Sequence, residues 1–394
     1  MAKILILGAG IFQVPLILQA KEMGCQVLVA SIKGNYPGIE LADLFIEADT
    51  SQTDQIVNIA KQHRIEAIVT TGTDISVPAL AAVAEELNLP GPTQKVAQTV
   101  SSKTQLRQFQ KKHGLNCPGF SICKKADDAV DFFKNNTGKT VFKPDDASGS
   151  RGVSIIEPDT NIEKVINAYH NAMQYSMNKV VCAEQFMVGI EVGGDAFLQN
   201  GRFLFLTTTT KHMDGVIVRG HSLPGDLPKN DIEKIKKELL ALTGRLGYSD
   251  GPLNFDVFVG NGQATILEAG LRNGGNGIPE IIKYAYNVDL IKILLSFAFG
   301  TIIDDPDINN VVNSSSYIFG SKTAGKIKRI TPFNELKTLV PELKQMHLAK
   351  KPGENIDVFN HNANLAGFCI INCDSKNYKK VTSVLHKHLI VEVE

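Results

Sequence analysis

The chain has 394 residues, of which 43% are apolar and 21% charged, a composition that fits a folded protein of about two or three domains and excludes a disordered one. Its 41 basic residues match its 41 acidic residues, which argues against a broad electrostatic surface for nucleic acid or anionic membrane. No apolar run has membrane-spanning length, and the six cysteines lack CxxC or metal-binding spacing. We therefore expect a cytoplasmic protein with reduced cysteines.

The amino-terminal part of the chain alternates short apolar runs with helical patterns. The apolar runs lie at residues 4–7, 27–30 and 67–70. The helical patterns lie at residues 15–23, 54–62 and 77–87. Because the runs are continuous, they are typical of parallel strands covered by helices on both faces, and they predict a doubly wound α/β domain. The Leu-Pro-Gly-Pro sequence at 89–92 breaks the pattern and marks a domain boundary.

The rest of the chain has a mixed α+β pattern. Single strands are predicted at residues 141–143, 153–156, 180–186, 191–198 and 203–210. Two more strands, near residues 255–269, flank Gly260-Asn261-Gly262, which is a hairpin signal. The end of the chain combines short strands with a closing helix and strand, so we expect a small carboxy-terminal α+β domain.

Gly8 and Gly10 follow the first predicted strand, where a tight turn lets a ligand approach the amino terminus of a helix. The dinucleotide fingerprint needs a third glycine, and the chain has Gln13 at that position. The glycines therefore predict a strand-to-helix turn that faces some other ligand. A nicotinamide-dependent oxidoreductase would use this turn, but it would leave the later lysines and acids without a role.

A lysine and a loop of small residues follow a predicted strand in the second region. Lys143 ends the strand at 141–143, and residues 147–152 read Ala-Ser-Gly-Ser-Arg-Gly. Small residues let backbone N–H groups wrap a polyphosphate, and the lysine supplies a positive charge. The lysine precedes the loop instead of following it, so the segment predicts a phosphate site that is not a P-loop.

Two acids, Asp256 and Glu268, lie in the two arms of the predicted hairpin. Because side chains alternate along a strand, a two-residue turn would direct them to opposite faces, whereas a three-residue loop at 260–262 directs both to one face. We predict the three-residue loop, which also places Asn254 opposite Glu268. Two carboxylates on one face suit Mg²⁺, which takes few protein ligands besides nucleotide phosphates. Arg272 follows, where it would neutralise a transferring phosphoryl group.

With Lys103 upstream of these features, the chain resembles the ATP-grasp superfamily and, within it, the carboxylate–amine ligases. The resemblance covers nearly the whole chain. It implies an amino-terminal domain at 1–95, a two-part ATP-grasp core at 96–310 with a lid at about 115–182, and a carboxy-terminal domain at 311–394. It also implies ATP and Mg²⁺ as cofactors and a reaction in which a carboxylate becomes an acyl phosphate and then an amide.

The resemblance further assigns roles to individual residues. The residues implied to bind the nucleotide are Lys103, Lys143, Ser148, Gly149, Ser150, Gly152, Glu184, Gln185, Phe186, Val188 and Glu191. Asp256 and Glu268 correspond to the Mg²⁺ ligands. The residues implied to act in catalysis are Arg272, Lys143 and Ser150.

One position departs from the family pattern. The family reads Glu-x-Asn-x-Arg, whereas this chain has Gly270 in place of the asparagine. The asparagine normally completes the metal shell, so its loss bears on a second metal ion more than on ATP. Asn254, Asn273 and Asn276 are the candidates to replace it.

Substrate-binding residues are expected near the ends of strands. Arg219 and His221 follow the strand at 203–210, and Arg219 would hold a substrate carboxylate. Asp74 and Gly10 follow predicted parallel strands, at the edge where ligands collect in such sheets.

The partners that the resemblance implies are a small-molecule carboxylate and an amine, without nucleic acid or membrane. Many members of the superfamily are dimers, so a homodimer is compatible with it. The identities of the acid and the amine stay open. Three alternatives also stay open. The acceptor could be thiol-like, the protein could be a purine-pathway or bicarbonate-using enzyme, or it could be a relative that binds nucleotide without turnover.

Overall fold

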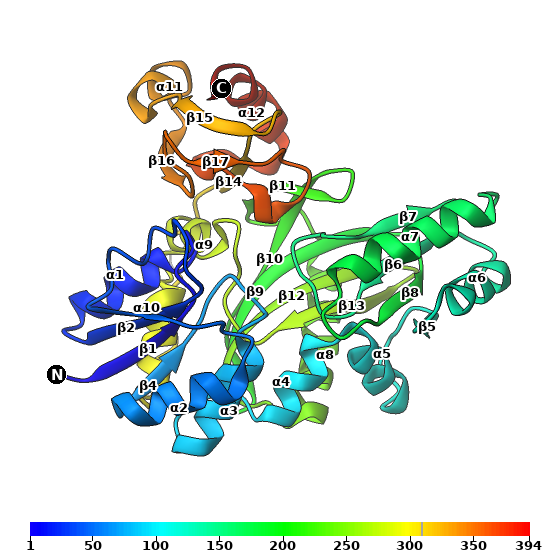
Figure 1. Ribbon diagram of the computed structural model, residues 1–394, viewed down its shortest axis with the longest axis horizontal. Helices are drawn as coiled ribbons and strands as arrows, with labels where there is room; N and C mark the ends of the chain where they lie inside the picture. The colour runs from blue at the N-terminus through cyan, green and yellow to red at the C-terminus, as the bar shows by residue number, and fades with distance from the viewer. Residues whose placement is uncertain (309) are drawn as a thin grey trace.

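The computed structural model describes residues 1–308 and 310–394, which form three regions around one large sheet (Figure 1). In this view the amino-terminal region lies to the left, a lid (residues 120–185) projects to the right, and the carboxy-terminal segment stands above the central sheet. A mixed α/β fold with one parallel sheet and one large antiparallel sheet is confirmed. Within the described residues, no helix combines the length and apolarity needed to cross a membrane.

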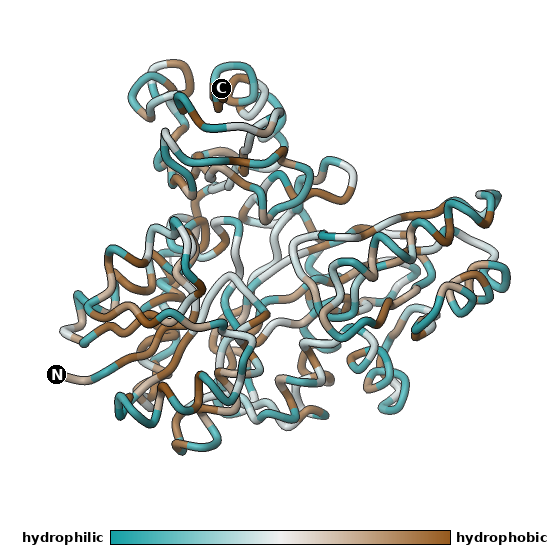
Figure 2. Tube along the Cα trace, in the orientation of Figure 1, coloured by the Kyte–Doolittle hydropathy of each residue, from teal (hydrophilic) through white to brown (hydrophobic). Residues whose placement is uncertain are grey.

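The amino-terminal region is a four-stranded parallel sheet, as the continuous apolar runs predict. In spatial order its strands are β3 (Leu44–Glu47), β2 (Gln26–Ser31), β1 (Lys3–Leu7) and β4 (Ala67–Val69). Figure 2 shows this region as the one richest in hydrophobic runs. The sequence did not predict β3, because this short edge strand is half exposed and lacks a continuous buried run.

The two faces of this parallel sheet pack against different helices. The helices are α1 (Val14–Glu22), α2 (Thr53–His63), α3 (Val77–Leu87) and α10 (Leu290–Ala298). Ile4 and Ile6 pack with α1 and α10, whereas Leu5 and Leu7 pack with α2 and α3. Helix α10 follows the central sheet in sequence, so the region at 1–95 is completed by a helix from outside its predicted boundary.

The lid is a four-stranded antiparallel sheet backed by two helices. In spatial order its strands are β5 (Phe120–Cys123), β8 (Val181–Gln185), β6 (Thr140–Pro144) and β7 (Ser154–Ile156). Helices α6 (Ala126–Asn135) and α7 (Ile162–Tyr175) enclose a small core that includes Phe133, Phe142 and Tyr169. Helices α4 (Gln94–Ser101) and α5 (Lys103–Lys112) connect the lid to the amino-terminal region.

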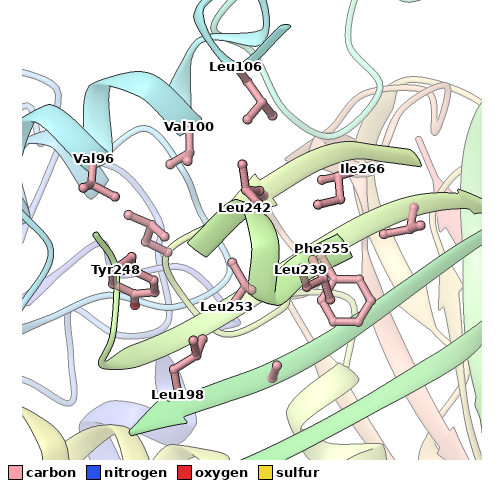
Figure 3. Close-up of a cluster of buried hydrophobic side chains, with 14 of the residues drawn as sticks. Val96, Val100, Leu106, Leu198, Leu239, Leu242, Tyr248, Leu253, Phe255 and Ile266 are labelled. Atoms are coloured by element: carbon pink, nitrogen blue, oxygen red, sulfur yellow. The ribbon is translucent and has the colours of Figure 1, made fainter. Parts of the chain in front are cut away.

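The central sheet has eight antiparallel strands. In spatial order they are β13 (Gln263–Gly270), β12 (Gly251–Gly260), β9 (Ile190–Gln199), β10 (Arg202–Asp214), β11 (Ile217–Leu223), β14 (Ser314–Phe319), β18 (Gly367–Ile371) and β16 (Leu343–Leu348). Helices α4, α5 and α8 (Lys229–Leu246) cover one face of β12 and β13, where Val100, Leu242 and Phe255 pack together (Figure 3). Side chains alternate along β12, so Asp256 is directed to the opposite face.

The carboxy-terminal segment shares the central sheet. Strand β14 pairs with β11 at only two positions, and β18 and β16 then extend the sheet. A second small sheet contains β17 (Asn355–Ile356), β15 (Gly325–Ile330) and β19 (Val391–Val393). It packs with α11 (Phe333–Leu339) and α12 (Ser375–His388). The segment has the expected α+β character, but its main sheet continues across the boundary predicted after residue 310.

Candidate functional site

Strands β12 and β13 form a hairpin with a two-residue turn, so the predicted three-residue loop is wrong. Gly260 pairs with Gln263, which leaves Asn261 and Gly262 as the turn. Both residues have positive φ, 50° and 77°, a conformation that Asn and Gly tolerate better than other residues. An Asn-Gly turn of this kind matches the twist of the strands and is therefore favoured over the longer loop.

A β-bulge in β13 nevertheless brings the two predicted metal ligands to one face. Val257 pairs with Ile266, and the next pair is Asp256 with Glu268. Leu267 is therefore an extra residue without a partner on β12. Without the bulge, the two-residue turn would place Leu267 opposite Asp256. The two acids share a face as expected, but the cause is the bulge and not the loop.

Helix α5 directs a lysine to this hairpin. The N–H of Thr104 donates to the buried Asp145 carboxylate at 2.7 Å, which fixes the first turn of the helix. Lys103 Nζ lies 3.3 Å from Glu268 Oε1 and donates to the carbonyl of Ala147 at 2.7 Å. The predicted first nucleotide lysine therefore lies between the acidic hairpin and the loop of small residues.

The second predicted lysine, Lys143, takes part in a buried ion cluster. Its Nζ lies 2.7 Å from Glu184 Oε2, and Arg107 Nε lies 2.9 Å from Glu184 Oε1. Burial alone would raise the pKa of Glu184, but Arg107 and Lys143 outweigh it and hold that pKa at about 2. Both oxygens of Glu184 are thus engaged in ion pairs, whereas the resemblance implied a nucleotide contact.

The other implied hinge residues follow Glu184 at the end of β8. Gln185 is the last residue of the strand, and Val188 is 77% exposed. Phe186 packs edge-on against Phe258 of β12 with a centroid distance of 6.4 Å. The hinge therefore connects the lid to the hairpin strand that carries Asp256.

The loop at 147–152 is shaped by residues with positive φ. These residues are Gly149 (72°), Ser150 (61°) and Gly152 (70°). The N–H of Asn362, from the short helix η1 (Asn362–Asn364), donates to the carbonyl of Gly149 at 3.3 Å. A Cβ at Gly152 would lie 2.7 Å from Tyr175 Cδ2, so the loop approaches α7 closely. The loop thus lies between the lid and the carboxy-terminal segment.

Sequence reasoning missed the two aspartates that precede this loop. Asp145 accepts hydrogen bonds from the Thr104 N–H and from the Asn178 side chain, at 2.7 and 2.6 Å. Asp146 accepts from the N–H groups of Met177 and Asn178, both at 2.9 Å. The acids fix the base of the loop to α5 and to the segment before β8.

A third lysine, Lys211 of β10, is central to the site and was not predicted. Its Nζ lies 2.5 Å from Glu191 Oε1 and 3.0 Å from Asp256 Oδ1. Burial would lower the pKa of Lys211, but Asp256 and Glu191 raise it above its ordinary value. Gly193 makes room for this lysine, because a Cβ there would lie 3.4 Å from Lys211 Cδ and 3.2 Å from Asp256 Oδ1.

Arg272 is held by Asp74, which reaches the hairpin from the loop after β4. Arg272 Nε and Nη2 donate to Asp74 Oδ1 and Oδ2 at 2.9 and 2.7 Å. A Cβ at Gly270 would lie only 2.6 Å from Asp74 Oδ1, so the aspartate fills the space that the family asparagine would need. Asn254 pairs with Gly270, not with Glu268 as predicted, and accepts from Arg272 Nη1 at 2.8 Å.

Arg219 and His221 lie on β11, a strand that the sequence did not predict because charged and glycine residues interrupt it. Arg219 pairs with Asp214 at 2.8 Å and lies over the Phe359 ring at 4.7 Å, so its guanidinium is already engaged. His221 is buried and hydrogen-bonded to Thr209 Oγ1 at 2.8 Å. Burial, with Lys211 nearby, places the pKa of His221 well below its ordinary value and keeps the ring neutral.

The glycines after β1 do not form an open anion site. The N–H of Gly10 donates to Gln13 Oε1 at 2.8 Å, and Gln13 Nε2 donates to the carbonyl of Thr71. Gln13 thus occupies the place of the third fingerprint glycine with its own hydrogen bonds. Of these two predicted substrate residues, Asp74 therefore lies at the predicted site and Gly10 does not.

A small cavity of about 40 Å³ lies among the residues that converge here. Its polar lining includes Asp74, Lys103, Ser148, Glu268 and Arg272. In the described part of the chain, no group of three or more His, Cys, Asp or Glu side chains is arranged to hold a metal ion. Two acids on one face still fit Mg²⁺, which is commonly held by one or two carboxylates with phosphates and water.

Residues 137–280 match the family model of the ATP-grasp domain. This part of the chain is similar to the ATP-grasp domain. The match spans most of the lid and the β9–β13 part of the central sheet, where the lysines and acids described above converge, and it confirms the expected superfamily.

Several of the relatives that the chain matches over most of its length are ligases by name. Over 301 residues it is 27% identical to a phosphoribosylamine–glycine ligase of Methanosarcina barkeri, covering 70% of this chain and 68% of that one. It is 21% identical over 310 residues to an L-arginine-specific L-amino acid ligase of Bacillus subtilis, covering 77% and 74%. The solved structure of an L-amino acid ligase from Bacillus licheniformis has the same fold, with a TM-score of 0.83 over 100% and 99% of the chains at 19% identity. The expected similarity to carboxylate–amine ligases is confirmed.

Proposed function

We propose that the protein is an ATP-dependent carboxylate–amine ligase that forms an amide through an acyl phosphate and releases ADP and phosphate. The observation that carries the proposal is that three lysines contact the acids of one site: Lys103 contacts Glu268, Lys143 contacts Glu184, and Lys211 contacts Asp256. Burial would raise the pKa of Glu268, but Lys103, Lys143 and Lys211 hold it below its ordinary value. These lysines come from α5, the lid and β10. A site with this concentration of positive charge around acids suits a triphosphate with a bound cation.

With ATP bound, Lys103 would exchange its contact with Glu268 for a phosphate. Lys143, which Glu184 holds in place, would also contact a phosphate, so that the two lysines bind the α- and β-phosphates. The loop at 147–152 borders the cavity of about 40 Å³ through Ala147 and Ser148, and it would move outward to admit the nucleotide. Closure of that loop, with Ser150 at its tip, would then exclude water from an acyl phosphate.

Asp256 and Glu268 would hold Mg²⁺, which supplies charge neutralisation at the phosphates. Arg272 would contact the transferred phosphoryl group, and Asp74 would hold the guanidinium in place until then. The protein needs no covalent nucleophile for this chemistry, because its residues position two reactants and stabilise charge.

The names of the relatives support amino acids as substrates. One name contains glycine and two contain L-amino acid. The similarity to a phosphoribosylamine–glycine ligase also favours a second candidate, in which the amine is carried by a phosphoribosyl group. An amino-acid panel and a phosphoribosyl amine therefore cover both candidates.

ADP release, measured with ATP, Mg²⁺ and pairs drawn from these compounds, tests the proposal. We expect release that depends strictly on both a carboxylate and an amine, together with trapping of an acyl phosphate by hydroxylamine. Glu268→Gln should abolish turnover without unfolding the protein. Glu233→Gln, an exposed change on α8, is the matched control and should retain full activity. Full activity in Glu268→Gln would contradict the proposal.

A further inference from the structure

Arg107 is the largest fully buried side chain in the described part of the chain, and no step of the proposed function uses it. It lies on α5, one helical turn after Lys103, and its side chain is 0% exposed. The cavity beside Lys103 is not lined by Arg107. A buried guanidinium is tolerated only when its N–H groups have partners, so the identity of those partners indicates what it does.

One side of the guanidinium faces the lid. Arg107 Nε donates to Glu184 Oε1 at 2.9 Å, and the other oxygen of Glu184 contacts Lys143 Nζ at 2.7 Å. Glu184 therefore transmits the position of Arg107 to the lysine at the end of β6.

The other side of the guanidinium faces the bulge in β13. Arg107 Nη2 donates to the carbonyl of Leu267 at 2.7 Å, and Nη1 donates to the carbonyl of Ile266 at 3.2 Å. Gln110 accepts from Nη1 at 2.8 Å and donates to the carbonyl of Ile266 at 2.9 Å. Because β13 is an edge strand, carbonyls that point away from β12 have no strand partner. The arginine and the glutamine provide donors at the two bulge residues.

We propose that Arg107 is a positioning residue that sets the register of the β12–β13 hairpin and thereby keeps Glu268 beside Asp256. If the bulge were lost by slippage, Leu267 would lie opposite Asp256 and Glu268 would turn to the other face. The same guanidinium orients Lys143 through Glu184. The inference rests on the proposed function only in taking the two acids as Mg²⁺ ligands.

Arginine and lysine differ at such a position. The planar guanidinium donates in several fixed directions and reaches Glu184 and both carbonyls at once. A lysine ammonium would keep the charge beside Glu184 but would not span the distance to the bulge. Arg107→Lys therefore separates the hairpin contact from the ion pair.

The test measures Mn²⁺ binding by electron paramagnetic resonance, in the presence and absence of ADP. In Arg107→Lys we expect the Mn²⁺ affinity of the ADP-bound protein to fall about tenfold or more, while metal-free ADP binding changes little. A role confined to general stability would lower the melting temperature without separating metal binding from nucleotide binding. Wild-type Mn²⁺ affinity in Arg107→Lys would overturn the proposal.

Two further variants keep the test decisive. Leu239→Ala removes a fully buried side chain from the same apolar layer and controls for lost stability, so its Mn²⁺ affinity should be that of the wild type. If Arg107→Lys does not fold, Gln110→Met removes one donor to the bulge and should also weaken Mn²⁺ binding; an unchanged affinity would overturn the proposal. A wild-type protein that binds neither Mn²⁺ nor ADP would instead refute the proposed function.

Discussion

Two ion clusters border the site, and they arrange the same kinds of charge in opposite ways. In the buried cluster, one acid lies between two cations: Glu184 contacts Lys143 and Arg107, and its side chain is 4% exposed. In the half-open cluster, one cation lies between two acids, Glu191 and Asp256, whose side chains are 32% and 33% exposed. The buried cluster has no free carboxylate surface, whereas the half-open cluster presents carboxylate oxygens to a ligand.

The difference indicates that the carboxylate of the buried cluster serves the structure, whereas the carboxylates of the half-open cluster are available to bind a ligand. A buried acid between two cations stabilises the fold most when all three groups are present, because removal of one group leaves a buried charge uncompensated. A lysine shared by two half-exposed acids loses less when one acid exchanges its partner for a metal ion or a phosphate-bound cation. We therefore expect changes in the buried cluster to affect folding and changes in the half-open cluster to affect binding.

The largest expected effect on stability comes from Glu184→Gln. The variant keeps the size of the side chain but leaves Arg107 and Lys143 without their shared countercharge, so the free energy of unfolding should fall by about 3 kcal/mol. Chemical denaturation measures the loss. Glu157→Gln, which removes an exposed pair with Lys139 in the same lid, is the control and should change stability little. A small loss in Glu184→Gln would mean that the two clusters are equivalent.

The same variant should change how stability depends on pH. The pKa of Glu184 is lowered from 4.5 to about 2, so protonation of this group favours the unfolded chain. The contribution of ionised Glu184 to the free energy of unfolding is complete above about pH 5 and is lost as the pH falls toward about 2. The difference in unfolding free energy between wild type and Glu184→Gln should therefore shrink over that interval. A difference that stays constant with pH would show that the Glu184 charge is not responsible.

The hairpin shows which part of this arrangement was readable from the sequence. The two lysines and two acids could be found because each lies in a recognisable local pattern. The turn was predicted wrongly, because a regular hairpin puts both acids on one face only with a longer loop, whereas Asn-Gly locally prefers a two-residue turn. The bulge that resolves this conflict depends on contacts with Arg107, which lies far from it in sequence.

Other parts of the site were unpredictable for a similar reason. Lys211 lies in a continuous run of polar residues in β10, and only the neighbouring Gly193 and the acids of two other strands distinguish it. Asp74 meets Arg272 because the parallel sheet docks against the central sheet, which no local pattern records. The parallel sheet itself was predictable, since β1 and β2 are continuous apolar runs that only two covered faces can accommodate.

A smaller effect on stability is expected at Gly270, where the chain departs from the family pattern. Gly270→Asn restores the family residue, but its Cβ would lie 2.6 Å from Asp74 Oδ1 and disturb the contact with Arg272. We expect lower activity and a stability loss of about 2 kcal/mol from overpacking. Gly138→Asn is the matched control, because Gly138 does not have positive φ and a Cβ there would have no neighbour within 4 Å. Normal activity in Gly270→Asn would mean that Asp74 moves aside freely.

The smallest effect on stability should come from Glu191→Gln in the half-open cluster. Lys211 keeps Asp256 as a partner at 3.0 Å, so the free energy of unfolding should fall by less than about 1 kcal/mol. ATP affinity should fall nevertheless, because the carboxylate that faces solvent is the one implied to bind the ribose. Calorimetric titration with ATP and denaturation of the same preparation measure both quantities. If Glu191→Gln destabilised the protein as much as Glu184→Gln while ATP bound normally, exposure would not distinguish binding charge from structural charge in this site.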